Sequence, residues 1–209
     1  MKKSQIDKTF ENYIDWNDKY VSIVARVVND NGVLPSKSDK CEVMEAFALK
    51  IYTQWSILCE ELLVDALNHD ASEYGKYMNL RVPKHNSRDT CASMIAGLNY
   101  FDFRNTGELK NIADNILVPE YNLFSVITRQ MQTRIDEFIL IRNYLAHDSN
   151  KAQRSVFKMY KDRWGMERFR EPGDFLLSFD SKSHKRRINI YLENFNNAAR
   201  AMMKFWFGP

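Results

Sequence analysis

The stretch MQTRIDEFILIRNYLAHDSN, residues 131–150, begins as an apolar helical pattern and turns polar at its end. The segment FILI, residues 138–141, is apolar around the whole circumference of a helix. Arg142, Asn143 and His147 follow within two turns. A polar cluster at the end of an apolar helix indicates either a functional site or a specific packing role.

The residues after His147 mark the end of this helix. DSN, residues 148–150, contains three residue types that favour helix N-termini. Asn150 also has the capping spacing to Gln153. We therefore predict two helices that meet at this break, over about 121–147 and about 150–164.

The rest of the chain is also predicted to be mainly helical, because the whole sequence holds only 7 Gly and 5 Pro. Asp39 and Glu42 have the spacing of a capping box, and apolar residues recur after them every three or four positions. The pattern predicts an all-α protein. Its other elements are a core helix at about 39–71, an N-terminal helix at about 5–28, short helical pieces within 74–119, an extended piece at 171–179 and a C-terminal helix at about 188–207.

The composition is that of a globular chain. Of 209 residues, 44% are hydrophobic and 27% are charged, which excludes a disordered chain and supplies a core of its own. No segment approaches the roughly 20 apolar residues of a membrane span, so we expect a cytoplasmic protein without a membrane partner. Cys41, Cys59 and Cys91 lack CxxC spacing, and we expect reduced thiols, no metal site and no cofactor.

Positive charge is concentrated in one part of the chain. Residues 151–187 hold eleven Lys or Arg against five Asp or Glu, a net +6, whereas the whole chain carries +3 and the remainder therefore −3. Such a segment is typical of a surface that binds a polyanion, although a well-solvated surface is the other interpretation. The candidate RNA-binding residues are Lys151, Arg154, Lys158, Lys185, Arg186 and Arg187.

Helical spacing places the polar cluster across the buried side of its helix. Asn143 and His147 share a face one turn apart, while Arg142 continues the apolar stripe. An unpaired buried guanidinium costs several kcal/mol, so Arg142 must meet a carboxylate, a phosphate or water. A pair with Asp136 or Glu137 would give it a structural role, and a catalytic role is the alternative.

The apolar circumference of FILI has a separate implication. A helix on the outside of one bundle cannot bury such a segment alone, but a second subunit can cover it. We therefore predict a homodimer with Arg142 and His147 at the contact between subunits.

The stretch RNYLAH, residues 142–147, resembles the Rx4–6H motif of HEPN domains, whose arginine is often followed by Asn. The resemblance covers roughly residues 38–163. It implies an up-down four-helix core within a single domain over 1–209, to which the helices at 5–28 and 188–207 are appendages. HEPN domains usually dimerise and bring two motifs together in a shared cleft, which agrees with the expected homodimer.

Many HEPN domains are metal-independent endoribonucleases of toxin–antitoxin or antiviral systems. The resemblance implies that His147 transfers a proton, that Arg142 holds the scissile phosphate, and that Asn143 orients the imidazole or a phosphate oxygen. Attack by the 2′-OH of single-stranded or loop RNA would leave a 2′,3′-cyclic phosphate and a 5′-hydroxyl. An antitoxin or defence protein is an expected partner. Other HEPN domains are inactive RNA-binding, nucleotide-binding or assembly modules, and this alternative remains open.

An acidic member of the site is less clearly marked. In some HEPN subfamilies Glu follows the Trp of the core helix, whereas Ser56 follows Trp55 here. Glu60 or Glu61, about one turn later, can take that place. We assign Glu61, which shares a face with Leu58, and a plain solvated glutamate is the alternative.

Overall fold

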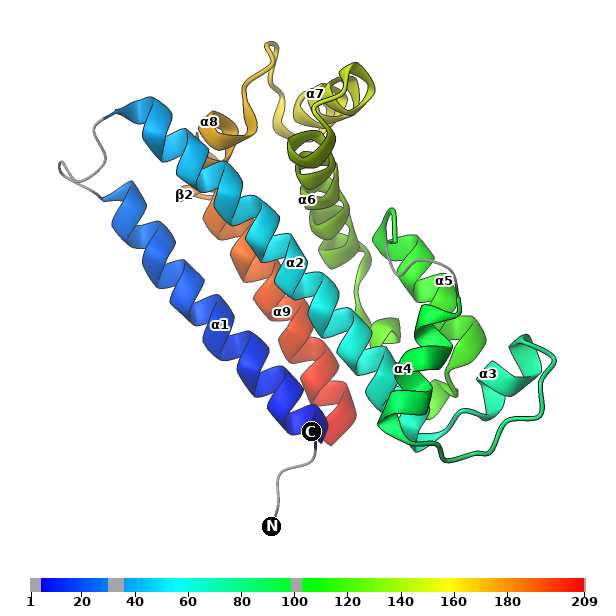
Figure 1. Ribbon diagram of the computed structural model, residues 1–209. Coiled ribbons are helices and arrows are strands. Elements are labelled where there is room, and N and C mark those ends of the chain that lie inside the picture. Colours follow the sequence, from blue (N-terminus) through cyan, green and yellow to red (C-terminus); the bar gives the residue numbers. More distant parts are fainter. Residues whose placement is uncertain (1–4, 30–35, 99–102, 209) are drawn as a thin grey trace. The chain divides into compact units, whose positions relative to one another are not determined.

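The structure is a computed structural model that describes residues 5–29, 36–98 and 103–208. These residues are mainly helical, and their only strands, β1 and β2, are two residues each and pair antiparallel, so the all-α class is confirmed (Figure 1). None of the described helices is both long and apolar enough to cross a lipid bilayer. The elements are α1 (Gln5–Val28), α2 (Lys37–His69), α3 (Ser72–Tyr77), α4 (Arg88–Ala96), α5 (Thr106–Ile116), the 3-10 helices η1 (Pro119–Tyr121) and η2 (Leu123–Val126), α6 (Arg129–His147), α7 (Asn150–Trp164), α8 (Pro172–Leu177), β1 (Phe179–Asp180), β2 (Lys185–Arg186) and α9 (Arg187–Phe207).

The chain divides into two compact units, each assembled from separate stretches of sequence. Helices α1, α2, α6 and α9 contribute residues to both units, whereas each of the other helices belongs to one. The described residues of the first unit are 5–14, 54–98, 103–132 and 197–208, and those of the second are 15–29, 36–53 and 133–196.

In the first unit the core surrounds Trp55 of α2, which is fully buried and meets the ring of Tyr13 of α1 edge to face at 6.2 Å. The short helices α4 and α5 begin at residues that cap them. Ser87 Oγ accepts the backbone N–H three residues ahead at 3.1 Å, and Asn105 Oδ1 does the same at 2.9 Å. Both residue types favour this position because their oxygens satisfy an N–H that the first turn leaves open.

In the second unit α6 packs against α9. The ring of Phe138 lies 5.3 Å from that of Tyr191 and 5.2 Å from that of Phe195, both in edge-on contact. All three are buried, and aromatic side chains of this size dominate the energy of a core. Replacing Phe138 by Ala would cost about 3–5 kcal/mol.

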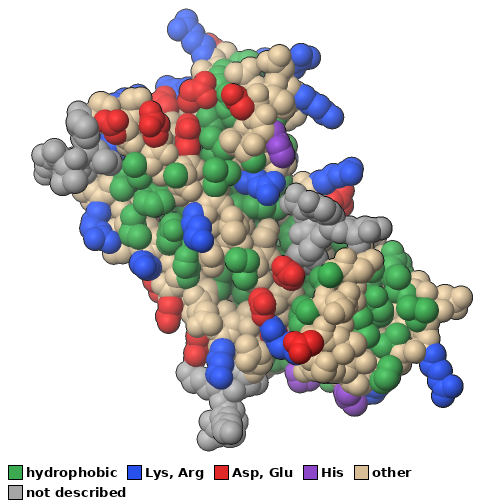
Figure 2. All heavy atoms as spheres, viewed as in Figure 1, with side chains coloured by type: hydrophobic (Ala, Val, Ile, Leu, Met, Phe, Trp, Pro, Cys, Tyr) green, Lys and Arg blue, Asp and Glu red, His purple; other side chains and the backbone are tan. Residues whose placement is uncertain are grey.

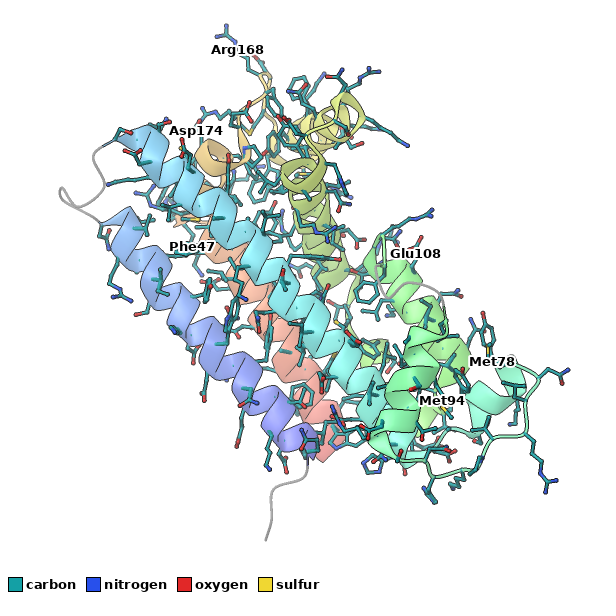
Figure 3. All side chains as sticks on the ribbon, in the orientation of Figure 1. Phe47, Met78, Met94, Glu108, Arg168 and Asp174 are labelled. Carbon is teal, nitrogen blue, oxygen red and sulfur yellow. The ribbon has the colours of Figure 1, made fainter. Side chains whose placement is uncertain are left out.

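The segment at 171–179, which we predicted to be extended, forms helix α8 and only then enters β1. Its conformation is decided by α2. The Gly173 N–H donates to Glu45 Oε1 at 2.9 Å, and a side chain at Gly173 would overlap the backbone of α2. The neighbouring Asp174 faces the start of α2 and pairs with Lys37 at 2.5 Å (Figure 3).

Other predicted boundaries are partly confirmed. The helices α1 at 5–28 and α7 at 150–164 match the predicted ranges. The N-cap of α2 differs, because Ser36 Oγ accepts the Asp39 N–H at 3.1 Å, and Ser36 therefore takes the role predicted for Asp39. The two 3-10 helices occupy 119–126, so α6 begins at Arg129 rather than near Tyr121.

Candidate active site at the end of α6

The polar cluster lies at the break between α6 and α7 that the sequence predicted. His147 is the last residue of α6, and Asp148 follows it in the left-handed region with φ at 39°. Glycine adopts this conformation most readily, and Asp tolerates it better than most residues do. Ser149 Oγ then accepts the Ala152 N–H at 3.2 Å, so the cap of α7 is Ser149 and not the predicted Asn150.

Arg142 is half-buried and is held between two neighbours. Its Nη1 donates to Asn143 Oδ1 at 2.9 Å, and its guanidinium carbon lies 4.7 Å from the centre of the Tyr52 ring. Tyr52 of α2 is 2% exposed, so its ring is a fixed platform for the cation. Sequence reasoning missed Tyr52, because no local pattern in α2 indicates which residue of α6 it meets.

Asn143 does not hydrogen-bond to His147, which was one of the two roles expected for it, and the other, a contact with a phosphate oxygen, stays a prediction. The side-chain oxygen of Asn143 accepts a hydrogen bond from Arg142 at 2.9 Å, so in this structure Asn143 orients the guanidinium. His147 is exposed, and its side chain has no hydrogen bond, ion pair or ring contact within the described part of the chain. The imidazole is therefore accessible to a ligand.

Tyr144, on the same turn, anchors the segment that follows α7. Its ring meets the ring of Phe169 edge-on at 5.7 Å, and its hydroxyl donates to Glu171 Oε2 at 3.3 Å. Burial, and then the charge of Glu171, raises the pKa of Tyr144 above its ordinary value. The hydroxyl consequently stays protonated at neutral pH and acts as a donor.

Glu61, the predicted acidic residue of the site, lies in the first unit. Its carboxylate pairs with Arg88 of α4, which also binds Asp65 at 3.0 Å. Glu60, the alternative, is exposed. The pairing with Arg88 gives Glu61 a structural role inside its own unit.

Three of the predicted RNA-binding residues share one face of α7. Lys151, Arg154 and Lys158 are exposed, and their spacings of three and four align them along the helix. Figure 2 shows Lys and Arg side chains that project into solvent around this end of the second unit. Arg168, in the segment after α7, also points away from the protein (Figure 3).

The other three candidates, at β2 and the start of α9, have partners in the fold. Lys185 pairs with a glutamate of α9 at 2.7 Å, and Arg186 donates to a backbone carbonyl of α8 at 2.5 Å. Arg187 is 9% exposed, and its guanidinium lies 5.0 Å from the rings of both Trp164 and Phe175. Burial lowers the pKa of Arg187 from its ordinary value. Arg187 therefore packs in the core, which corrects its predicted place on an RNA-binding surface.

Three of the four residues of the apolar segment FILI are covered within the chain, and the fourth, Leu140, is half-buried. Phe138, Ile139 and Ile141 are at most 2% exposed. Burial of these three side chains therefore does not require a second subunit. The homodimer stays a prediction that depends on the HEPN resemblance alone.

Over residues 5–29, 36–98 and 103–208, no group of three or more His, Cys, Asp or Glu side chains is arranged to hold a metal ion. No protein-family model matches the chain, and it has no significant match to a curated protein or a solved structure.

Proposed function

We propose that the chain is a metal-independent endoribonuclease of the HEPN type that cleaves single-stranded or loop RNA in the cytoplasm. The observation that carries the proposal is the position of Arg142 and His147 in the last two turns of α6, where Tyr52 holds the cation and the imidazole is exposed. A fixed cation and an accessible proton-transfer group are the two elements that cleavage by the RNA's own hydroxyl requires.

In the proposed reaction His147 accepts the proton of the 2′-OH while the 2′-oxygen forms a bond to phosphorus. The bond between phosphorus and the 5′-oxygen breaks, and the 5′-oxygen takes up a proton as it leaves. The products are a 2′,3′-cyclic phosphate and a 5′-hydroxyl. Proton transfer by a positioned imidazole contributes about 10²–10⁴-fold to the rate of such a reaction.

Arg142 would bind the scissile phosphate and stabilise the charge that develops on its oxygens. The hydrogen bond to Asn143 and the stacking on Tyr52 restrict the plane of the guanidinium. A restricted guanidinium loses less conformational entropy when it binds a phosphate than a flexible lysine does. This arrangement supports a role for Arg142 in holding RNA.

The α7 row of Lys151, Arg154 and Lys158 supports the choice of RNA as substrate, since exposed cations at helical spacing can follow a phosphate backbone. The proposed setting is a toxin–antitoxin or antiphage system with a neutralising or associated partner protein. A homodimer that joins two copies of the cluster is part of the proposal.

A second candidate function is an inactive HEPN module that binds RNA or a nucleotide, or assembles with a partner. It is favoured by His147, whose side chain has no hydrogen-bond partner among the described residues to set its tautomer. The pairing of Glu61 with Arg88 also favours an inactive module, because it engages the carboxylate that was predicted to be the acidic residue of the active site.

The two candidates are separated by a cleavage assay on labelled total RNA in EDTA. We expect wild-type cleavage that falls at least about 100-fold in His147→Ala. His85→Ala is the matched control, because His85 is also exposed and should leave cleavage unchanged. Arg142→Ala should also abolish cleavage and weaken RNA binding. Absence of EDTA-resistant cleavage by the wild type, with RNA binding retained in all variants, would support the inactive module instead.

A further inference from the structure

Helices α6 and α7 line an open groove with a volume of about 360 Å³, entirely within the second unit. Each helix contributes residues at spacings of three and four, so the groove is lined by one face of each helix. The volume lies at the lower end of the range typical of small-ligand sites. The lining residues are Thr133, Asp136, Glu137 and Leu140 from α6, and Ser155, Lys158, Met159, Asp162 and Arg163 from α7.

Glu137 is the unusual member of this lining, because it is a carboxylate that is only 3% exposed. Its Oε2 accepts hydrogen bonds from Arg134 at 2.7 Å and from the Tyr191 hydroxyl at 3.1 Å. Its Oε1 is buried and accepts no hydrogen bond. The Arg163 Nε lies 3.9 Å from Oε1, which is too long for a hydrogen bond. A buried acceptor without a donor is uncommon and requires an explanation.

Helix α7 contributes charges of both signs to the lining, Lys158 and Arg163 as cations and Asp162 as a carboxylate. Lys158 is exposed at the rim, and within the described residues its ammonium has no ion pair or hydrogen bond. Leu140 and Met159 contribute apolar side chains to the lining. The groove lining therefore combines an acceptor without a donor, apolar side chains and two cations, Lys158 and Arg163, which lie among the carboxylates Asp136, Glu137 and Asp162.

We propose that this groove binds one nucleotide of the RNA, with the amino group of its base donating to Glu137 Oε1 and its phosphate at Lys158. The choice of a nucleotide as the ligand rests on the proposed ribonuclease function. Arg163 covers Oε1 in the unliganded protein, and its side chain is 57% exposed, so it turns outward as the base enters. The amino group of such a base supplies the hydrogen-bond donor that Glu137 Oε1 lacks.

The proposal predicts selectivity between the pyrimidines, which differ at one position of the base edge. Cytosine presents an N4 amino group to a carboxylate, whereas uracil presents an O4 oxygen that a carboxylate repels. Glu137 lies ten residues before His147 on α6, which is about 15 Å along the helix axis. The groove therefore selects a base near the cleaved linkage rather than the nucleotide that supplies the 2′-OH.

The test is titration calorimetry of the full chain with cytidine and uridine 5′-monophosphate. We expect the wild type to bind the cytidine nucleotide at least about tenfold more tightly. Glu137→Gln should bring the two affinities close together, because an amide can either donate or accept. Ser155→Phe fills the groove without touching the buried contacts of Glu137 and should remove binding of both nucleotides. Lys161→Gln is the matched control on α7 and should change neither affinity.

Equal affinities in the wild type, or a preference that survives Glu137→Gln and Ser155→Phe, would overturn the proposal, as would no binding of either nucleotide at millimolar concentration. The His147→Ala variant separates this inference from the proposed function. It should lose cleavage and keep the preference for cytidine. A wild type that cleaves RNA without this preference refutes the groove alone, and a preference without cleavage refutes the ribonuclease alone.

Discussion

Two buried carboxylates, Asp65 in the first unit and Glu137 in the second, differ in how their oxygens are supplied with hydrogen-bond donors. Asp65 is 5% exposed, and a donor lies near each of its oxygens: Arg88 Nε at 3.0 Å, and the Thr9 hydroxyl at 3.4 Å, which Asp65 shares with the Gln5 carbonyl at 3.2 Å. Glu137 is 3% exposed, and two donors share one oxygen while the other oxygen has none.

We call the network around Asp65 closed, because each carboxylate oxygen has a donor nearby, and the network around Glu137 open, because one oxygen has none. A buried network in which every polar atom has a partner stabilises one conformation. A network that leaves an acceptor unmet keeps the desolvation cost of that atom, about 1–3 kcal/mol, until a ligand supplies a donor. The contrast is why we place a binding site at Glu137 and a structural role at Asp65.

Among changes to the partners of these buried carboxylates, the largest expected effect on stability is that of Arg88→Ala, which leaves Asp65 without its cation. We expect a loss of about 3 kcal/mol at pH 7, the lower end for a broken buried pair because Arg88 is 35% exposed. Urea denaturation followed by circular dichroism measures the loss. Arg81→Ala, which changes an exposed arginine of the same unit, is the control and should cost under about 0.5 kcal/mol.

The stability loss in Arg88→Ala should also depend on pH. Burial raises the pKa of Asp65, although Arg88 opposes the shift, and removing Arg88 raises this pKa further. A folded-state pKa above the unfolded value adds stability at low pH that is lost as the pH rises through it. The gap between wild type and Arg88→Ala should therefore narrow as the pH falls toward 4. A gap that is constant with pH would show that the charge of Asp65 is not its cause.

A smaller effect is expected for Arg134→Ala in the open network, about 1–2 kcal/mol. Arg163 lies 3.9 Å from Glu137 and can approach it when Arg134 is absent. The double variant Arg134→Ala/Arg163→Ala should therefore cost more than the two single variants together, by roughly 0.5–3 kcal/mol. Additive losses in urea denaturation would mean that Arg163 does not substitute for Arg134.

Local signals explain which parts of this fold were predictable. The ends of α1 and α7 follow from apolar spacing and from the polar residues beside them, and both ranges match the structure. Helix α8 was missed because its conformation depends on Glu45, which lies 128 residues before Gly173. Capping was predicted one to three residues away from the true caps, Ser36 and Ser149, since several adjacent residues had suitable side chains.

In the candidate site, too, features with a local sequence signal were predictable and features set by tertiary contacts were not. The pattern at Arg142 and His147 is readable in the sequence because one helix carries both residues. Tyr52, which holds Arg142, comes from another helix and has no local signal. Arg187 was predicted to face RNA because it ends a basic run, but aromatic rings from α7 and α8 enclose it. Tertiary contacts therefore decide which charged residues are available to a ligand.

The smallest expected effect concerns a third buried carboxylate, Asp70, which can be compared with Asp65 and Glu137. Asp70 is 7% exposed and has partners on both oxygens. The Ser72 N–H donates to it at 2.9 Å, and Lys84 lies 3.2 Å away. Lys84 is 63% exposed, so Lys84→Ala should cost less than about 1 kcal/mol at pH 7.

The pH dependence of that small loss should distinguish it from the loss in Arg88→Ala. Burial opposes the ionisation of Asp70, but the Ser72 hydrogen bonds and then Lys84 outweigh it and lower the pKa of Asp70. A lowered folded-state pKa adds stability above the unfolded value, about 3.9, that is lost as the pH falls through the folded pKa. The gap between wild type and Lys84→Ala should therefore persist to a lower pH than the gap for Arg88→Ala, because Asp65 binds its proton at a higher pH than Asp70. Urea denaturation of both variants between pH 3 and 7 measures the two gaps, and closure of both at the same pH would contradict the assignment of Asp65 and Asp70 to different environments.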